Sequence, residues 1–440
     1  MVRVCRRWRR IIFASPLRLN LTIVCTSKTP VSKSLDIWPP FPIAVHYTPC
    51  EPFGDDINVV DALQHRGRVT DIRFKSVTSA ELISFFTAMD HPFSSLTYLS
   101  LESIEDDDSF LPADFLGESA PSLRTLLLER IAFPALPTLL LSTTQLVTLR
   151  LSSVPTIGYM LPGVIASCLV LLPNLEQLGL EFHSPDTSDD EMDVDESGPS
   201  LPTRAVLRSL VSFHFEGISQ YLEDLLAQID APNLQTMSAT FHDDITHIPQ
   251  LLRFTDCAGR FGPPIRAMVE FEFWRVILKF MPSDGFQLVI IYKQSVEQVS
   301  SMALVCRELL PLVSRVERLD LYCSSRPPST DSNLWLDLFQ PFISVQRLFV
   351  STNVWPDVTP PLQELIGEGP AKILPELRVL FLEEFQPSTD AQKSIESFIT
   401  VRRLSNHPVV VQHCTARDFD PLAFCSWPGR RWHARVDGRQ

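Results

Sequence analysis

The chain has 440 residues, of which 45% are hydrophobic, and it carries 38 lysines and arginines against 52 aspartates and glutamates. This length exceeds what one compact core usually supports, so the chain should form either several domains or a repeat array. The formal net charge of −14 argues against nonspecific binding to nucleic acid or to anionic lipid.

The first predicted element is an amphipathic helix over Val4 to Ile12, with the sequence VCRRWRRII. Val4, Trp8 and Ile11 share one face, and four arginines occupy the remainder. We interpret the arginines as the solvated face of a helix that packs on the end of the fold. A nuclear-import signal or a nucleic-acid patch is the alternative.

Beyond this helix, the spacing L-x-x-L-x-L returns along most of the chain. It is clearest in PSLRTLLLER, which begins at Pro121 and places Leu123, Leu126 and Leu128 in that spacing. Ten further candidates have their first apolar position at 69, 96, 146, 175, 210, 234, 268, 316, 345 and 377. The last two apolar positions alternate, as a half-buried strand requires, and the first five copies are 27, 27, 23 and 29 residues apart.

Apolar stripes at helical spacing follow many of these strands. A capping box at Thr78 to Glu81 opens one such helix, and comparable stripes occur near residues 164–172, 222–229, 299–310, 338–342 and 395–399. Because no single repeat can cover its own apolar face, neighbouring repeats must stack. The sequence therefore predicts an α/β fold, a leucine-rich-repeat solenoid (horseshoe) with a short N-terminal helical cap.

Two segments interrupt the repeats. Residues 183–200 carry seven carboxylates and no cation, and we predict a disordered acidic insert there. Between positions 268 and 316 the step lengthens to 48, and FQLVIIYKQS, from Phe286, should supply an irregular strand. The predicted organisation is a helix over 1–20, the solenoid over 21–415 and an irregular basic tail over 416–440.

VCRRWRRIIFASPLRLNL resembles the final helix and exit of an F-box, as found in the F-box-like repeat proteins abundant in mushroom-forming fungi. The stretches TSKTPVSKSLDIWPPFPIAVHY, SQYLEDLLAQIDAPNLQ and LPELRVLFLEE resemble the same family. The resemblance implies a substrate receptor of a Skp–cullin–F-box ubiquitin ligase. In that role Val4, Trp8 and Ile11 are candidate contacts of the ligase adaptor, although we favour a core position for Trp8, and the repeats hold the target.

An F-box extends well upstream of this helix, to a Leu-Pro element, whereas this sequence starts at Met1. Two alternatives follow from the difference. Either the sequence lacks the product of a first exon, or this member has lost adaptor binding and serves as a leucine-rich-repeat scaffold outside any ligase.

No motif in the sequence strongly indicates a phosphate-binding, metal-binding or catalytic site. GEGPAK, from Gly367, lacks the spacer and the Ser or Thr of a phosphate-binding loop. HDDITH offers metal-ligand types at His242, Asp243, Asp244 and His247, but a polar loop is the simpler interpretation. We expect no catalytic, metal or cofactor site, and an enzyme that uses HDDITH is the third reading.

The positions just after the last apolar residue of each strand should face the concave side. They are Lys75, Glu102, Glu129, Ser152, Glu181, Glu216, Thr240, Trp274, Tyr322, Ser351 and Glu383. We predict that Glu102, Glu129, Glu181 and Glu216, with Trp274 and Tyr322 as aromatic anchors, dock a basic segment of a target protein. Glu102 and Glu129 should lie about 5 Å apart, where they repel each other unless a cation joins them.

The cysteines and the hydropathy suggest the compartment. The nine cysteines include no C-x-x-C pair, which favours reduced thiols over a disulfide framework. No apolar run reaches about eighteen residues, and the N-terminal run is too short for a signal peptide. We expect a soluble monomer in the cytoplasm, the nucleus or both.

Overall fold

The computed structural model describes residues 22–31, 33, 35, 41–49, 56–105, 109–182, 204–243, 245, 247–257, 264–273, 275–281, 287–292, 298–323, 332–351, 353–355, 358, 373–383, 389–404 and 407–414. Its contacts divide the chain into two compact units, unit 1 over residues 1–261 and unit 2 over 262–440. The predicted N-terminal helix, acidic insert and basic tail lie outside the described residues. None of the described helices is long and apolar enough to cross a membrane.

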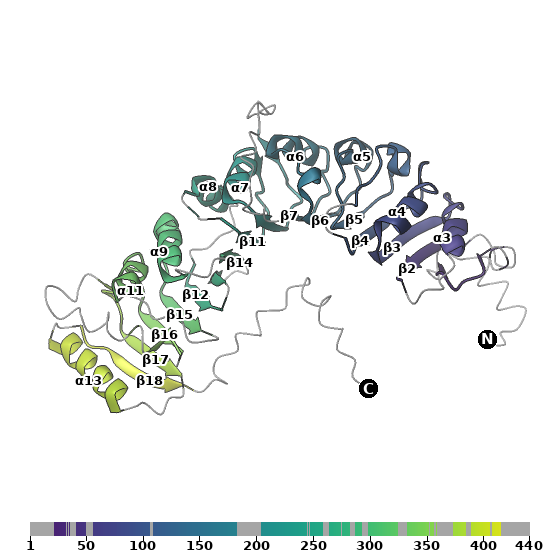
Figure 1. The fold of residues 1–440 in the computed structure, drawn as a ribbon. Helices are drawn as coiled ribbons and strands as arrows, with labels where there is room; N and C mark the ends of the chain where they lie inside the picture. Colours follow the sequence, from purple (N-terminus) through teal and green to yellow (C-terminus); the bar gives the residue numbers. More distant parts are fainter. Residues whose placement is uncertain are drawn as a thin grey trace, which may run out of the picture. The chain divides into compact units, whose positions relative to one another are not determined.

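Unit 1 is built on a parallel sheet to which each repeat contributes one strand (Figure 1). In spatial order the strands are β1 (Ile23–Cys25), β2 (Ile43–Tyr47), β3 (Val69–Val77), β4 (Tyr98–Ser103), β5 (Thr125–Glu129), β6 (Thr148–Val154), β7 (Gln177–Phe182), β9 (Ser212–Gly217) and β11 (Thr236–Phe241). The short strands β8 (Ala205–Val206) and β10 (Ile229–Asp230) pair separately.

The helices of unit 1 connect these strands and lie along one side of them (Figure 1). They are α3 (Asp56–Leu63), α4 (Ser79–Phe86), α5 (Leu136–Ser142), α6 (Pro162–Leu169), α7 (Ser219–Leu226) and α8 (Pro249–Cys257), with 3-10 turns η2 (Phe115–Glu118) and η3 (Thr156–Gly158). The capping box predicted at Thr78 is present, since its side chain accepts from the Glu81 amide and Glu81 accepts from the Thr78 amide. The predicted mixed α/β fold with a parallel sheet is confirmed.

Unit 2 has its own parallel run, formed by β12 (Arg266–Phe271), β15 (Arg318–Cys323), β16 (Arg347–Val350), β17 (Val379–Glu383) and β18 (Val410–Cys414). Its helices are α9 (Gln298–Glu308), α10 (Leu310–Val313), α11 (Ser332–Phe339) and α13 (Thr389–Leu404). Leu310, predicted on the buried stripe of the first of these helices, is 46% exposed because α9 ends before it.

The long step between positions 268 and 316 holds more than the one irregular strand predicted there. Two strands, β13 (Val276–Met281) and β14 (Gln287–Tyr292), fold antiparallel to each other, and β13 is also antiparallel to β12. The strand missed is β13, whose sequence VILKFM is almost continuously apolar and lacks the repeat spacing. Pattern matching to the repeat therefore passed over it.

The core of unit 1 is a ladder of repeat leucines. The register pairs Leu99 with Leu126, Leu126 with Leu149 and Leu149 with Leu178, one rung for each strand. All four side chains are at most 2% exposed. Each strand completes the burial of its neighbour, so the ladder is stable only as a stack.

Side chains from neighbouring repeats accept hydrogen bonds from amides at the starts of helices. The Glu105 carboxylate accepts from the Ser79 amide of α4 at 3.0 Å, and that of Asp243 accepts from the Ser219 amide of α7 at 2.8 Å. Glu223, in α7, accepts from the amides of Gln250 and Leu251 in α8. Each contact satisfies amides that a helix leaves unpaired and fastens one repeat to the next.

We predict that Leu126→Ala lowers the free energy of unfolding by about 2–5 kcal/mol, because it opens a cavity in the ladder. The matched control is Leu141→Ala in the same repeat, whose leucine side chain is 63% exposed, against 0% for Leu126. The control should change stability by no more than about 0.5 kcal/mol in urea denaturation. Equal losses in the two variants would contradict the assignment of buried positions.

Candidate protein-binding face

Successive side chains of each strand point to opposite faces of the unit 1 sheet, and the repeat leucines lie on only one of these faces. We call the side chains of β3 to β11 that alternate with the buried leucines the open face. Strand register aligns these side chains in rows across the sheet. The first row is Asp71, Tyr98, Thr125, Thr148, Gln177, Ser212 and Thr236, and the second is Arg73, Ser100, Leu127, Arg150, Gly179, His214 and Ser238. The third position holds Lys75, Glu102, Glu129, Ser152, Glu181, Glu216 and Thr240.

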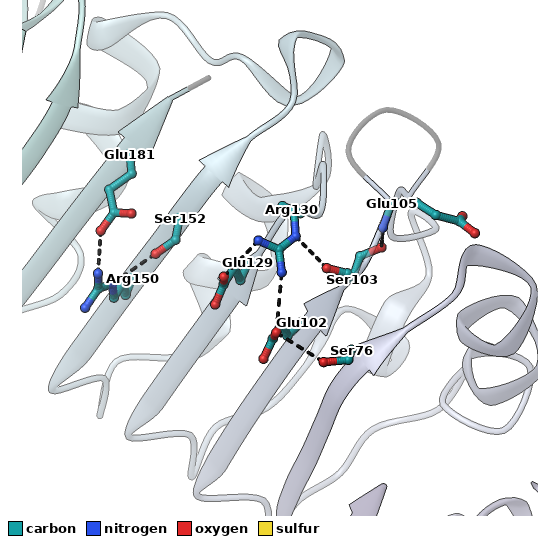
Figure 2. A network of polar contacts seen from close by, with 9 residues as sticks. All are labelled: Ser76, Glu102, Ser103, Glu105, Glu129, Arg130, Arg150, Ser152 and Glu181. Atoms are coloured by element: carbon teal, nitrogen blue, oxygen red, sulfur yellow. Dashed lines mark hydrogen bonds and ion pairs between the residues drawn. The ribbon is translucent and has the colours of Figure 1, made fainter. Parts of the chain in front are cut away.

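Glu102 and Glu129 are direct register partners in β4 and β5, as predicted. A cation of the chain itself, Arg130, lies between them (Figure 2). Its guanidinium nitrogens lie 3.4 Å from the Glu102 carboxylate and 3.1 Å from that of Glu129, and its Nε donates to the Ser103 carbonyl at 2.6 Å. The repulsion expected between the two carboxylates is therefore offset within the fold.

Backbone conformation brings Arg130 to this place. Simple alternation would turn the residue after Glu129 toward the core, but Arg130 has a φ of 54°, in the left-handed region. Ser76 and Ser153, at the corresponding ends of β3 and β6, have φ values of 53° and 50°. A non-glycine residue rarely adopts this conformation, and the contacts of Arg130 compensate for the cost.

Glu181 has a second set of partners. A terminal nitrogen of Arg150 lies 2.5 Å from its carboxylate, and His214 Nε2 lies 3.2 Å from it. Gly179 stands between Arg150 and His214 in the second row, and a Cβ there would lie 3.0 Å from the Cγ of Arg150. The glycine therefore leaves room for the arginine side chain to cross the sheet.

The environment of Glu181 favours its charged form. Burial by itself would raise its pKa, but the hydrogen bond from His214 and the charge of Arg150 outweigh it, and the pKa falls from 4.5 to about 2. Glu181 is thus a partly buried, ionised carboxylate held by Arg150 from β6 and by His214 from β9. Arg150, which faces solvent in a simple alternation, is a structural residue.

Two further carboxylates of the open face, Glu216 and Asp71, also have partners. His242 Nε2 lies 3.5 Å from the Glu216 carboxylate. Arg73 binds Asp71 at 2.7 Å, and its guanidinium stacks over the Tyr98 ring at 4.3 Å from the ring centroid. The result is a face of ion pairs interspersed with hydroxyl and apolar side chains.

The structure brings the predicted glutamates together in two pairs. Glu102 adjoins Glu129, and Glu181 adjoins Glu216, but a register shift between Leu151 and Val154 separates the pairs. Tyr322 belongs to unit 2, where it packs on Phe349 at 5.1 Å between ring centroids. Val4, Trp8, Ile11 and Trp274 lie outside the described residues.

Sequence reasoning missed the cations that neutralise this face. Arg150 and Ser152 are two residues apart on one strand, so the alternation rule could have placed both beside the glutamates. Arg130 left no such signal, because only its left-handed φ turns it toward them.

The side chains of Asp243 and His242, in the HDDITH stretch, make contacts that stabilise the fold. Asp243 accepts from both the amide and the hydroxyl of Ser219, and His242 faces Glu216. In the described part of the chain, no group of three or more His, Cys, Asp or Glu residues could hold a metal ion. Burial raises the pKa of the Cys25, Cys168 and Cys306 thiols, so these cysteines are poor nucleophiles.

Solved structures similar to this chain include a leucine-rich-repeat protein. The crystal structure of the leucine-rich repeat-containing protein LegL7 from Legionella pneumophila is similar at 14% sequence identity, over 78% of this chain and 92% of that chain, with a TM-score of 0.27. No protein-family model matches the chain, and no curated protein matches it. The function is therefore argued from the geometry of this chain.

We predict that the effect of Glu129→Gln on the free energy of unfolding has opposite signs in the presence and in the absence of Arg130. With Arg130 present it should lower the free energy of unfolding by about 0.5 kcal/mol, because an ion pair is lost. In the Arg130→Gln background it should raise stability by a similar amount, because it removes the repulsion from Glu102. Urea denaturation of the four proteins in this double-mutant cycle measures the coupling. Losses that simply add would show that Arg130 does not join the two carboxylates.

The low pKa of Glu181 predicts a defined acid dependence. A carboxylate whose folded pKa lies below its unfolded value stabilises the fold above the unfolded pKa, and the contribution is lost as pH falls toward the folded value. The window here runs from 4.5 down to about 2. At neutral pH, the free energy of unfolding of wild type should exceed that of Glu181→Gln by at most about 3 kcal/mol. This difference should narrow by about 1 kcal/mol between pH 5 and pH 3.5. Urea denaturation at several pH values measures it, and a constant difference would contradict the proposed ion pairs.

Proposed function

We propose that this protein is a leucine-rich-repeat solenoid that recognises other proteins through the open face of unit 1. The observation that supports this most directly is the row register of that face, which spaces side chains about 4.8 Å apart on a rigid sheet. Tyr98 and Leu127 place aromatic and apolar surface among the ion pairs, a composition suited to protein interfaces. A partner can bind such a surface with little ordering of the receptor.

The charge of the open face supports the predicted basic target only weakly. Five carboxylates of this face (Asp71, Glu102, Glu129, Glu181 and Glu216) stand against three lysines and arginines of the face (Arg73, Lys75 and Arg150) and against Arg130, which joins it from the end of β5. The excess negative charge is therefore only one. We propose that shape and apolar contact supply more of the affinity than charge, and that charge selects against acidic partners.

The finer proposal is that the target is presented to a ubiquitin ligase. It rests on the resemblance of VCRRWRRIIFASPLRLNL to the end of an F-box, in which Val4, Trp8 and Ile11 would contact the adaptor. The protein would then act in the cytoplasm or nucleus as a receptor without a catalytic residue of its own. The alternative is a leucine-rich-repeat scaffold that binds its partner but no ligase adaptor.

One capture experiment tests the recognition face and separates the two alternatives. We predict that Leu127→Glu on the open face abolishes the binding of proteins that wild type captures from its native cell lysate, because it places an unpaired charge in the interface. Leu141→Glu in the same repeat, on an exposed position of α5, is the matched control and should capture the same proteins as wild type. Quantitative mass spectrometry compares the three baits.

The outcomes are distinct. Identical capture by the two variants would overturn the open-face proposal. Recovery of a Skp-type adaptor with wild type and with both variants, but not with a Trp8→Asp variant, would support the ligase receptor. Target recovery without any adaptor would support the scaffold.

A further inference from the structure

Exposed apolar side chains gather at the edge of the unit 1 sheet where its parallel strands end. Ile104 and Phe110 belong to the connection that follows β4, and Ile157 lies in η3, which follows β6. Their side chains are 52%, 58% and 69% exposed. We call these three residues the exit patch. Single exposed apolar side chains are common on protein surfaces, so the significance of this group depends on whether it is continuous.

The connection after β4 holds Ile104 and Phe110 on its outer side. The hydroxyls of Ser103 and Ser109, both buried, lie 2.6 Å apart, and each serine directly precedes one of the two apolar residues. Successive side chains of an extended chain point in opposite directions. Because the serines point inward, Ile104 and Phe110 both turn to solvent beside their contact.

Ala132, which follows β5, joins Phe110 to Ile157. Phe110 and Ala132 form a parallel bridge, in which the Leu111 amide donates to the Ala132 carbonyl at 2.9 Å. Ala132 also meets η3, since a Cβ added at Gly158 would lie 2.9 Å from the Ala132 Cβ. In the sheet, β5 lies between β4 and β6. The exit patch therefore continues across three successive repeats.

Asp114 borders the exit patch. Its neighbour Phe115 packs on Phe133 at 5.7 Å between ring centroids, which brings the connection after β4 against the connection after β5. Asp114 is exposed, and its side chain makes no capping hydrogen bond with η2. It forms no ion pair with any residue that the structure describes. Its charge can therefore interact with a partner.

Glu105 supplies a second carboxylate at this edge. It directly follows Ile104, and its amide donates to Ser103 Oγ at 3.0 Å (Figure 2). Its carboxylate accepts from the Ser79 amide at the start of α4, and this helix N-terminus offsets part of the charge. Asp114 is thus the stronger of the two attractions for a cation.

Cations are absent from these connections. Residues 103–118, 131–135 and 155–161 contain no lysine and no arginine. Arg130, at the end of β5, is held between two glutamates of the open face. The exit patch is therefore apolar surface with negative charge at its border.

We propose that the exit patch binds a basic amphipathic segment of a partner protein, with apolar side chains on Phe110 and Ile157 and a lysine or arginine facing Asp114. An amphipathic helix presents apolar and basic side chains on adjacent faces, so it suits an apolar patch with an acidic border. The same carboxylates disfavour anionic lipid and nucleic acid. The inference does not depend on the proposed function, because none of these residues belongs to the open face.

The test is fluorescence polarisation with the full chain and a labelled peptide in which leucine and lysine recur at helical spacing on opposite faces. We expect the double variant Phe110→Ser/Ile157→Ser to bind about tenfold more weakly than wild type, because it removes the apolar anchors. Asp114→Lys should bind about threefold more weakly at low salt, and this loss should shrink as salt is raised.

Each kind of change has a matched control in unit 1. Leu141→Ser replaces a similarly exposed apolar side chain on α5, and Glu176→Lys reverses an exposed charge just before β7, at the opposite edge of the sheet. Both controls should bind within about twofold of wild type. All the substituted side chains are exposed, so circular dichroism of every variant should match wild type.

Three results would overturn the proposal: equal binding by the patch variants and the controls, equal binding of a peptide of the same composition whose scrambled order has no apolar face, or no binding at low salt. Tighter Phe110-dependent binding to vesicles of phosphatidylcholine and phosphatidylglycerol would also overturn it, in favour of a lipid surface. None of these results bears on Leu127→Glu, which tests a different face, so failure here leaves the proposed function standing.

Discussion

The burial of one leucine rung by the next is the interaction on which the rest of this structure depends. A strand and helix of repeat length cannot remove their own apolar face from water, so each of Leu99, Leu126 and Leu149 is buried only because another strand lies beside it. Parallel stacking in a constant register follows from this requirement. The capping contacts of Glu105, Asp243 and Glu223 then fasten neighbouring repeats at the helix side.

Constant register has a consequence for the opposite face of each sheet. When equivalent positions of successive repeats align, similar residues become neighbours, and like charges meet about 5 Å apart. Unit 1 brings Glu102 beside Glu129 and places Arg130 between them. Unit 2 brings Arg266 beside Arg318 and places the buried Asp320 between them. The same physical problem thus has the same solution in both units, with the signs of the charges reversed.

These internal ion pairs also reduce the net charge that a sheet face presents to solvent. A carboxylate that already holds a guanidinium gives little net charge to a partner, so under the proposed function the open face of unit 1 would depend on its shape and on residues such as Tyr98 and Leu127.

Much of the fold could be predicted from the L-x-x-L-x-L spacing. The features that could not be predicted are one strand and the partner of two glutamates. Leu126 and Leu128 were assigned to the buried side of their strand from spacing alone, and they are 0% and 1% exposed. The strand β13 was missed because its apolar run carries no repeat signal. The pairing of Glu102 with Glu129 in adjacent strands was predicted correctly, whereas the position of their partner Arg130 was not, because it depends on a left-handed turn that local spacing does not reveal.

The sequence by itself determined the parallel strands, the helices that follow them and the identity of the buried leucines. It could do so because hydrophobic periodicity is a local property that each repeat carries in full. Only the tertiary structure decided which charges meet. The partners in these ion pairs stand 28 residues apart for Glu102 and Arg130, 31 for Arg150 and Glu181, and 54 for Arg266 and Asp320. Contacts of that kind depend on register, turn conformation and burial, which exist only after the repeats have stacked.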